Sequence, residues 1–555
     1  MMLWEFTKPL YFCNLPLLIH SYYEGELKIV WRFYIMHRSL MKTVIVSALS
    51  LSTILTVGWQ DQDAEAANTQ ELSIGKNHLP ETRVTQPLAK GVTYTDITRG
   101  YYSDKSYYTV DVAFFDTKEQ ARILIQDLKK KGYKVKIYKV ENKYSQNTDV
   151  KEKTIGYVVR TGEFQEEKAA NDVADQLKAQ GFEKAKATYS EYDGTMNSTG
   201  PWKIDVLEID PDEFQGELTN SLGKGTITGR ETVSSMAGRT EALAGMNGGY
   251  FVVGSEDGIP GDPAGISVVN GQLVSEAIGS RTSLLLSGNE AEIASTSTSL
   301  KVETESGESS VIDGINRQPG LIRSCGGVGD KETNQPKHDV TCTDAEEIIE
   351  YNAAFGDETP KGDGFEVILD EKGKVVDIYY ERGHSIPENG SVLSATGAQA
   401  DWLKQKVSEG ETLSITRNVS ADGKQVKTFS DLDIIGGAPQ LLDDGKIDIK
   451  AKEEGFAWSH DFFYHFAQYR HPRSFAGIKE NGNILLVTVE GRNPEKSIGV
   501  SFHESAQILK SLGAVKGMNL DGGGSSAMVV HDRLVNKPSD VTGERPVSDG
   551  ILVMP

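Results

Sequence analysis

An internal repeat constrains the fold of this 555-residue chain more than any other feature. The stretches "YTVDVAFFDTKEQARILIQDLKKKGYKVKI" and "YVVRTGEFQEEKAANDVADQLKAQGFEKAKA" align at a constant offset, so that Phe115 matches Phe164 and Leu128 matches Leu177. Each copy predicts a strand, an amphipathic helix ended by glycine, and a second strand. The two βαβ-type copies together predict a small α+β domain over residues 101–192.

This repeat resembles the SPOR domain across residues 105–190. The second copy is the better match, through Gly162, Phe164, Ala170 and Leu177. SPOR domains bind the glycan strands of peptidoglycan, so the resemblance implies peptidoglycan or another cell-wall glycan as a partner. A ferredoxin-like domain without affinity for the wall is the alternative.

The sequence before the repeat contains a segment typical of a secretory signal. Basic residues precede a short apolar run, Val44–Val57, which is too short to span a bilayer comfortably. An A-x-A site then places cleavage after Ala66. We expect residues 1–66 to be a signal-peptide region whose real start is Met36 or Met41. The protein would then be secreted or associated with the cell wall, with no stable membrane span after processing; an uncleaved anchor is the alternative.

The net charge limits which classes of partner the chain can bind. The chain carries a formal charge of −22 and has a pI near 5.0, which excludes a general electrostatic attraction to nucleic acid. An anionic substrate must therefore meet a local cluster of Arg or His. Residues 67–100 are polar without a sustained period and predict a linker.

Residues 193–555 predict a strand-rich α+β domain. Short alternating runs such as "WKIDVLEID" and "GNILLVTVEG" lie between Gly, Asn and Asp turns. The clearest helix is "SFHESAQILKSLG", where Ser501 and Glu504 form a capping box and Gly513 ends the helix.

The stretch "GMNLDGGGSSAMVV" contains the most informative polar cluster. Asn519 and Asp521 precede three glycines between two apolar runs that predict strands. A glycine backbone can approach a ligand closely and offer its N–H groups, so a binding loop is one interpretation. A glycine-rich hairpin is the other.

Together with further polar clusters, this stretch makes residues 235–555 resemble the phosphodiester glycosidase family. The matching motifs are the "NGGYF" turn, an Arg before a "GI" strand, the "EGR" strand end, the "NLDGGGS" loop and the "RPV" near the terminus. Two features depart from the family: Glu490 stands where Asp is common, and an insertion carries two cysteines.

The resemblance implies cleavage between an anomeric sugar carbon and a phosphodiester oxygen, with N-acetylglucosamine-type sugars released from a sugar-phosphate polymer. Charge grows on the phosphate as the bond breaks and needs donors, and the sugar carbon needs a carboxylate. The catalytic candidates are Arg473 and Arg492 as phosphate clamps, with Asp521 and then Glu490 as the carboxylate. The substrate-binding candidates are Asn247, Gly248, Gly249, Asn519, Gly522, Gly523, Gly524, Ser525 and Ser526.

No residues have zinc-ligand spacing, and no cofactor is required by the sequence. As an alternative, a hard cation such as calcium could be held by Asp262, Asp549 and Asp521, although their spacing does not match a known calcium-binding loop. Cys325 and Cys342 are expected to form a disulfide, as paired cysteines of exported chains do. His471 and His503 are left open between a catalytic and a structural role.

Two other functions remain open from the sequence. One is a non-catalytic protein that binds cell-wall glycan, which the complete set of Arg, carboxylate and glycine loop disfavours. The other is a metal-dependent phosphodiesterase that cleaves P–O instead of C–O, which the missing His/Asp metal cluster disfavours.

Overall fold

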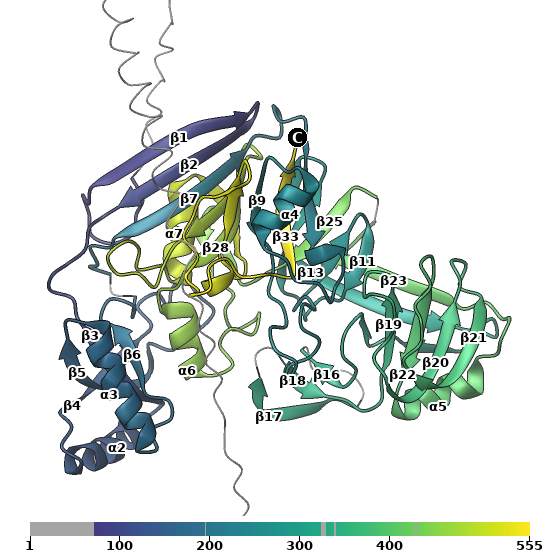
Figure 1. Ribbon diagram of the computed structural model, residues 1–555, viewed down its shortest axis with the longest axis horizontal. Coiled ribbons are helices and arrows are strands. Elements are labelled where there is room, and N and C mark those ends of the chain that lie inside the picture. Colours follow the sequence, from purple (N-terminus) through teal and green to yellow (C-terminus); the bar gives the residue numbers. More distant parts are fainter. Residues whose placement is uncertain (1–70, 195, 324–328, 338–339, 428–429) are drawn as a thin grey trace, which may run out of the picture. The chain divides into compact units, whose positions relative to one another are not determined.

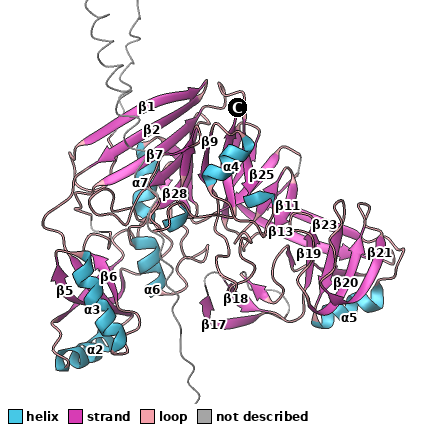
Figure 2. Ribbon diagram, in the orientation of Figure 1, coloured by secondary structure: helices cyan, strands magenta, loops and turns pink. Residues whose placement is uncertain are grey.

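The computed structural model describes residues 71–555 except 195, 324–328, 338–339 and 428–429. These residues belong to one compact unit, Thr69–Pro555, and form a strand-rich α+β structure (Figures 1 and 2). The expected signal region, residues 1–66, lies outside the described residues. Among the residues that are described, no helix has both the length and the apolar character needed to cross a membrane.

The repeat forms the expected small domain. Its four-stranded sheet has the order β4-β5-β3-β6, and the bounds are β3 (Tyr108–Phe115), α2 (Lys118–Lys130), β4 (Val135–Glu141), β5 (Thr154–Phe164), α3 (Glu167–Ala179) and β6 (Lys186–Tyr189). Both strand–helix–strand units are therefore confirmed. Matching positions of the two copies, Leu128 and Leu177, are fully buried in the core between sheet and helices, where apolar burial stabilises the domain.

A central eight-stranded sheet carries the rest of the fold. Its order is β1 (Glu81–Ala89), β2 (Val92–Arg99), β7 (Trp202–Ile209), β29 (Ile484–Val489), β28 (Arg473–Lys479), β30 (Ala514–Asn519), β26 (Gln440–Asp443) and β27 (Lys446–Ile447). One face packs on the core around Trp202 and the other on the core around Leu207. Helix α7 (Phe502–Ser511) begins with the expected capping box of Ser501 and Glu504.

The expectation that residues 67–100 form a linker is wrong. Residues Glu81–Ala89 and Val92–Arg99 are paired strands at the edge of the central sheet. Three side chains of the second strand are buried, those of Val92, Tyr94 and Ile97. Their apolar contacts stabilise a segment whose polar composition suggested a linker. The SPOR-like domain is thus inserted between β2 and β7, two neighbouring strands of one sheet.

A five-stranded sheet lies beside the central one. Its order is β32 (Arg533–Leu534), β31 (Met528–Val530), β9 (Ala244–Asn247), β33 (Asp549–Met554) and β8 (Glu217–Leu222). The remaining helices and helical turns are η1 (Gly223–Gly225), α4 (Val233–Thr240), α5 (Gly397–Lys406), α6 (His460–Phe462), η2 (Phe463–Gln468) and η3 (Gly523–Ser525).

Three more sheets are formed by the middle of the chain. One contains β10 (Ser267–Val269), β11 (Gln272–Ser275), β12 (Thr282–Ser287), β13 (Glu290–Glu303), β14 (Ser309–Val311), β23 (Ser414–Ala421), β24 (Lys424–Val426) and β25 (Leu432–Gly436). The second contains β15 (Gly314–Ile315), β19 (Ile348–Asn352), β20 (Gly362–Leu369), β21 (Val375–Arg382) and β22 (Ser391–Ala395). The third contains β16 (Leu321–Ile322), β17 (Lys331–Lys337) and β18 (Val340–Thr343).

The cysteine insertion belongs to this third sheet. Cys342 is buried on β18 and is disulfide-bonded. Its expected partner, Cys325, lies outside the described residues, so the pairing stays a prediction.

Candidate active site

The glycine loop connects two different sheets. It leaves β30 of the central sheet at Asn519, forms the turn η3, and enters β31 of the five-stranded sheet. The two flanking strands are as expected, but they do not pair with each other, which excludes the hairpin. A Cβ on Gly522 would lie 2.8 Å from the carbonyl oxygen of Pro472, and Gly523 has a φ of 62°. Glycine is therefore required where the loop crosses the start of β28.

Two buried asparagines hold the loop in place. Asn247 donates from Nδ2 to the carbonyl oxygen of Asp521 at 2.8 Å and accepts from Ser474 Oγ at 2.6 Å. Asn519 donates to Tyr250 Oη at 2.7 Å. Both asparagines were expected to contact a sugar, but both are fully buried. Their amides orient the backbone that carries Asp521.

Arg473 is a buried cation held by carbonyl groups. Its side chain is 2% exposed, and it donates from Nε to the carbonyl oxygen of Val500 at 3.3 Å and from Nη2 to that of Phe466. Within the described part of the chain, no carboxylate lies within ion-pair distance of its guanidinium. Burial lowers the pKa of Arg473 to about 10, with the charge of Asp521 acting in the opposite direction. A buried cation in this setting favours an anionic ligand.

Arg492 lies across the same loop. It is exposed, its φ is 59°, and its Nη2 is 3.1 Å from where a Cβ on Gly523 would lie. Its Nη1 donates to Ser539 Oγ at 3.2 Å. The structure therefore brings Asp521, Arg473 and Arg492 around Gly522 and Gly523.

A third arginine at the loop was not among the expected site residues. Arg545 forms an ion pair with Asp540 at 2.8 Å and donates to Ser525 Oγ at 3.4 Å. A Cβ on Gly524 would lie 2.2 Å from its Nη2. The "RPV" motif was the signal in the sequence that marks it.

Asp549 lies at the same corner of the site as a buried carboxyl group. It is 1% exposed and accepts from the Gly249 N–H at 2.9 Å. Burial, with the nearby charge of Asp521, raises the pKa of Asp549 to about 7. Gly248, whose N–H donates to the Asp549 carbonyl at 3.1 Å, completes this corner.

The alternative of a cation held by Asp262 and Asp549 finds no support in the geometry. Asp262 is instead paired with Arg323 at 3.2 Å, and burial raises its pKa to about 7. Across residues 71–555, apart from the gaps given above, no three His, Cys, Asp or Glu side chains are grouped to hold a metal ion.

Glu490 lies in a different cluster. Arg473 pairs with Val489, the last residue of β29, and the next residue, Glu490, continues the ladder by donating its N–H to the Lys203 carbonyl oxygen at 3.0 Å. Because side chains alternate along such a ladder, Glu490 points to the face opposite that of Arg473. It accepts from the Lys537 N–H at 2.8 Å, and its charge helps to raise the pKa of buried Asp205 to about 7, mainly an effect of burial.

The two histidines are neutral. Burial and the charge of Arg473 lower the pKa of His471 to about 3, and its Nε2 donates to the His465 carbonyl oxygen at 2.7 Å. His503 is 8% exposed and stacks on Tyr144, and burial lowers its pKa to about 4. The structure gives both side chains packing contacts.

Asp549→Asn is expected to change how stability depends on pH. An acid whose pKa rises from 3.8 to about 7 on folding destabilises the fold increasingly between those values, by at most about 4 kcal/mol. Asn does not ionise and still accepts from Gly249. Relative to the parent, the variant should gain thermal stability between pH 5 and pH 8, and calorimetry at both values measures this. An equal difference at both pH values would contradict it.

Two family models and one solved structure match large parts of the chain. The model of the family described as phosphodiester glycosidase matches residues 363–554, and that of the SPOR domain matches residues 104–185. A solved structure of a protein described as exported, from Burkholderia pseudomallei, is 31% identical with a TM-score of 0.78, over 88% of this chain and 98% of that one.

Two curated proteins match over shorter stretches. The N-acetylglucosamine-1-phosphodiester alpha-N-acetylglucosaminidase of Bos taurus is 32% identical over 78 residues, 14% of each chain. The SPbeta prophage-derived protein YomE of Bacillus subtilis is 33% identical over 84 residues, 15% of this chain and 13% of its own. The chain thus matches only a small part of either protein's length.

Proposed function

Because residues 363–554 match the phosphodiester glycosidase family model and residues 104–185 match the SPOR domain model, we propose that the protein is an exported, cell-wall-associated hydrolase. It cleaves sugar 1-phosphodiesters, of the N-acetylglucosamine type, at the anomeric C–O bond. The observation that carries this proposal is Arg473, a buried guanidinium with no carboxylate partner among the described residues, beside Asp521 and the glycine loop.

The phosphate side of the substrate lies against Arg473 and Arg492. A guanidinium presents a planar pair of donors that matches two phosphate oxygens. Gly522 and Gly523 bring the backbone of the loop close to both arginines. As the C1–O bond breaks, its electron pair moves to the phosphoester oxygen, and the two cations stabilise the phosphomonoester that leaves.

The sugar side lies against Asp521. A cationic centre develops at C1, and an ionised carboxylate stabilises it and serves as base or nucleophile. Asp549 suits the role of the general acid, because burial and the charge of Asp521 raise its pKa to about 7. Two carboxyls whose surroundings separate their protonation states divide the acid and base roles in this way. Glu490, which the sequence offered as the second choice for this carboxylate, lies on the other face of the sheet and accepts from the Lys537 N–H.

The SPOR domain supports the assignment of a wall location. A matched SPOR domain favours a peptidoglycan partner, and the Burkholderia relative is described as exported. A phosphodiester-linked wall or capsule polymer is then a substrate that lies next to the bound glycan.

Hydrolysis in ¹⁸O-labelled water tests the proposed bond. We expect a panel of sugar 1-phosphodiesters to release free sugar that carries the label, because water adds to C1 and the original oxygen stays with phosphate. Label in the phosphate would instead show P–O cleavage. No hydrolysis across the panel, with glycan binding retained, would favour the non-catalytic binding protein.

A further inference from the structure

An ion pair is buried in the SPOR domain on the sheet face opposite its helices. Arg160 of β5 donates from Nε to Asp111 of β3 at 2.6 Å, and their side chains are 8% and 4% exposed. Neighbouring Val110 and Val112 point to the helix side and lie in the domain's own core. Alternation along the strand therefore turns Asp111 away from that core.

Two tyrosines from the glycosidase part complete this ion pair. Tyr469 donates to Asp111 Oδ2 at 2.7 Å, while Arg160 Nη2 donates to Tyr464 Oη at 3.1 Å and Tyr469 Oη at 3.2 Å. Burial alone would raise the pKa of Asp111, but Arg160, His465 and Tyr469 together hold it at about 2. Besides their own bond, and an Asp193 oxygen 3.6 Å from Arg160 Nη1, the two charged groups thus gain hydrogen-bond partners from the second domain.

The same tyrosines belong to the helical turn that holds the active-site arginine. Tyr464 lies in η2, a π-helical turn, and Tyr469 caps its end. Between them, the Phe466 carbonyl oxygen accepts from Arg473 Nη2, and the Phe466 ring lies 5.3 Å from the Arg473 guanidinium carbon. Turns of this kind are frequent at functional sites.

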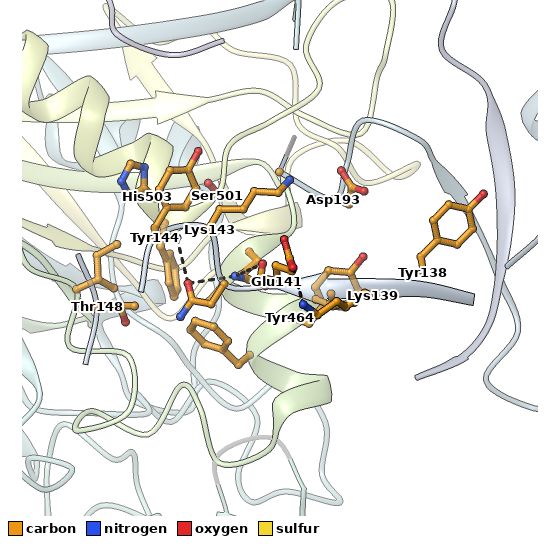
Figure 3. A pocket seen from close by; sticks show the side chains of 18 of the residues that line it. Tyr138, Lys139, Glu141, Lys143, Tyr144, Thr148, Asp193, Tyr464, Ser501 and His503 are labelled. Carbon is orange, nitrogen blue, oxygen red and sulfur yellow. Dashed lines mark hydrogen bonds and ion pairs between the residues drawn. The ribbon is translucent and has the colours of Figure 1, made fainter. Parts of the chain in front are cut away.

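The packing beside this network is open. A cavity of about 120 Å³ is lined by both parts of the chain, with Tyr138 and Lys139 from the SPOR domain and Tyr464 and His503 from the glycosidase part (Figure 3). Phe502, whose ring centroid is 4.3 Å from the Arg473 guanidinium carbon, also lines it. Apolar packing is therefore incomplete here, and the polar network connects the SPOR sheet to η2.

We propose that Asp111 and Arg160 are positioning residues for Arg473. Through Tyr464 and Tyr469 they fix η2, and η2 fixes the guanidinium that receives the phosphate. The SPOR domain would then complete the active site in addition to binding the wall. The inference rests on the proposed function for its kinetic test.

A double-mutant cycle in the full chain tests this coupling. The variant Tyr464→Phe/Tyr469→Phe removes two hydroxyls with little change of shape, so the fold is retained. We expect kcat/KM for a sugar 1-phosphodiester to fall about tenfold, mainly through kcat, and no further fall when Arg473→Lys is already present. An equal fall in both backgrounds would overturn the proposal. Arg160→Gln/Asp111→Asn should behave in the same way.

The accessibility of Arg473 to a chemical reagent can be measured without relying on activity. Phenylglyoxal modifies arginine, and mass mapping gives the rate at Arg473. We expect this rate to rise about tenfold in the tyrosine variant, because its surroundings open more often, and to stay unchanged in Lys136→Gln, which removes an exposed ion pair with Glu163. An unchanged rate in the tyrosine variant would overturn the positioning role. Failure of hydrolysis in the parent protein would overturn the proposed function and leave this measurement intact.

Discussion

Asp521→Asn is expected to reduce turnover by at least about 10³-fold, on the order of 4 kcal/mol of transition-state stabilisation. In the parent protein the Gly522 N–H donates to Asp521 Oδ1 at 2.8 Å. Asn keeps the shape of the side chain, and its amide oxygen still accepts this hydrogen bond. The charge that faces the developing cation at C1 is lost. Steady-state kinetics on a sugar 1-phosphodiester measures the effect.

A matched control separates this loss from a general effect of removing a carboxylate. Asp444→Asn changes an exposed aspartate in the turn between β26 and β27 and should leave turnover unchanged. If Asp521→Asn stays within about tenfold of the parent, Asp521 only supports the loop structure, and another group must supply the carboxylate at C1.

Arg473→Lys is expected to lower kcat/KM by about 10²-fold. Lysine loses the planar pair of donors. It also enters a buried position with no carboxylate partner among the described residues, where burial already lowers the pKa of arginine to about 10. A lysine there loses its charge more readily, so activity of the variant should recover as the pH falls.

Leaving groups distinguish this defect from that of Asp521→Asn. Aryl phosphodiesters carry a better leaving group than alkyl ones and depend less on the clamp, so they should rescue Arg473→Lys more than Asp521→Asn. Arg122→Lys, on the exposed surface of α2, provides the control. Equal rescue of both variants would contradict the division of roles between phosphate and sugar.

Local patterns in the sequence predicted local structure well. The repeat, the capping box of α7 and the strands on either side of the glycine loop were all predicted, because each depends on periodicity and capping within a few residues. The edge strands β1 and β2 were not predicted. Strand β2 pairs with β7, a partner about 110 residues later in the chain, as the pairing of Thr95 with Val206 shows, and β1 in turn pairs with β2.

The site shows the same division. Asp521, Arg473 and Arg492 were expected together and lie around one loop. The sequence alone did not predict on which face Glu490 points, because that depends on the register of β28 and β29. Nor did it predict that Asn247 would be used internally, since its partner Ser474 lies on a strand more than 200 residues away.

The point of insertion of the SPOR domain has a consequence for how the protein would work on a wall. The domain leaves the central sheet after Arg99 and returns at Trp202, and these two residues are directly paired. A domain on a flexible terminal linker sweeps a volume set by the length of its tether. A domain whose two ends join directly paired residues of neighbouring strands has no such tether. For a glycan-bound molecule, the spacing of phosphodiesters along the wall, more than their total number, would then determine how many bonds come within reach.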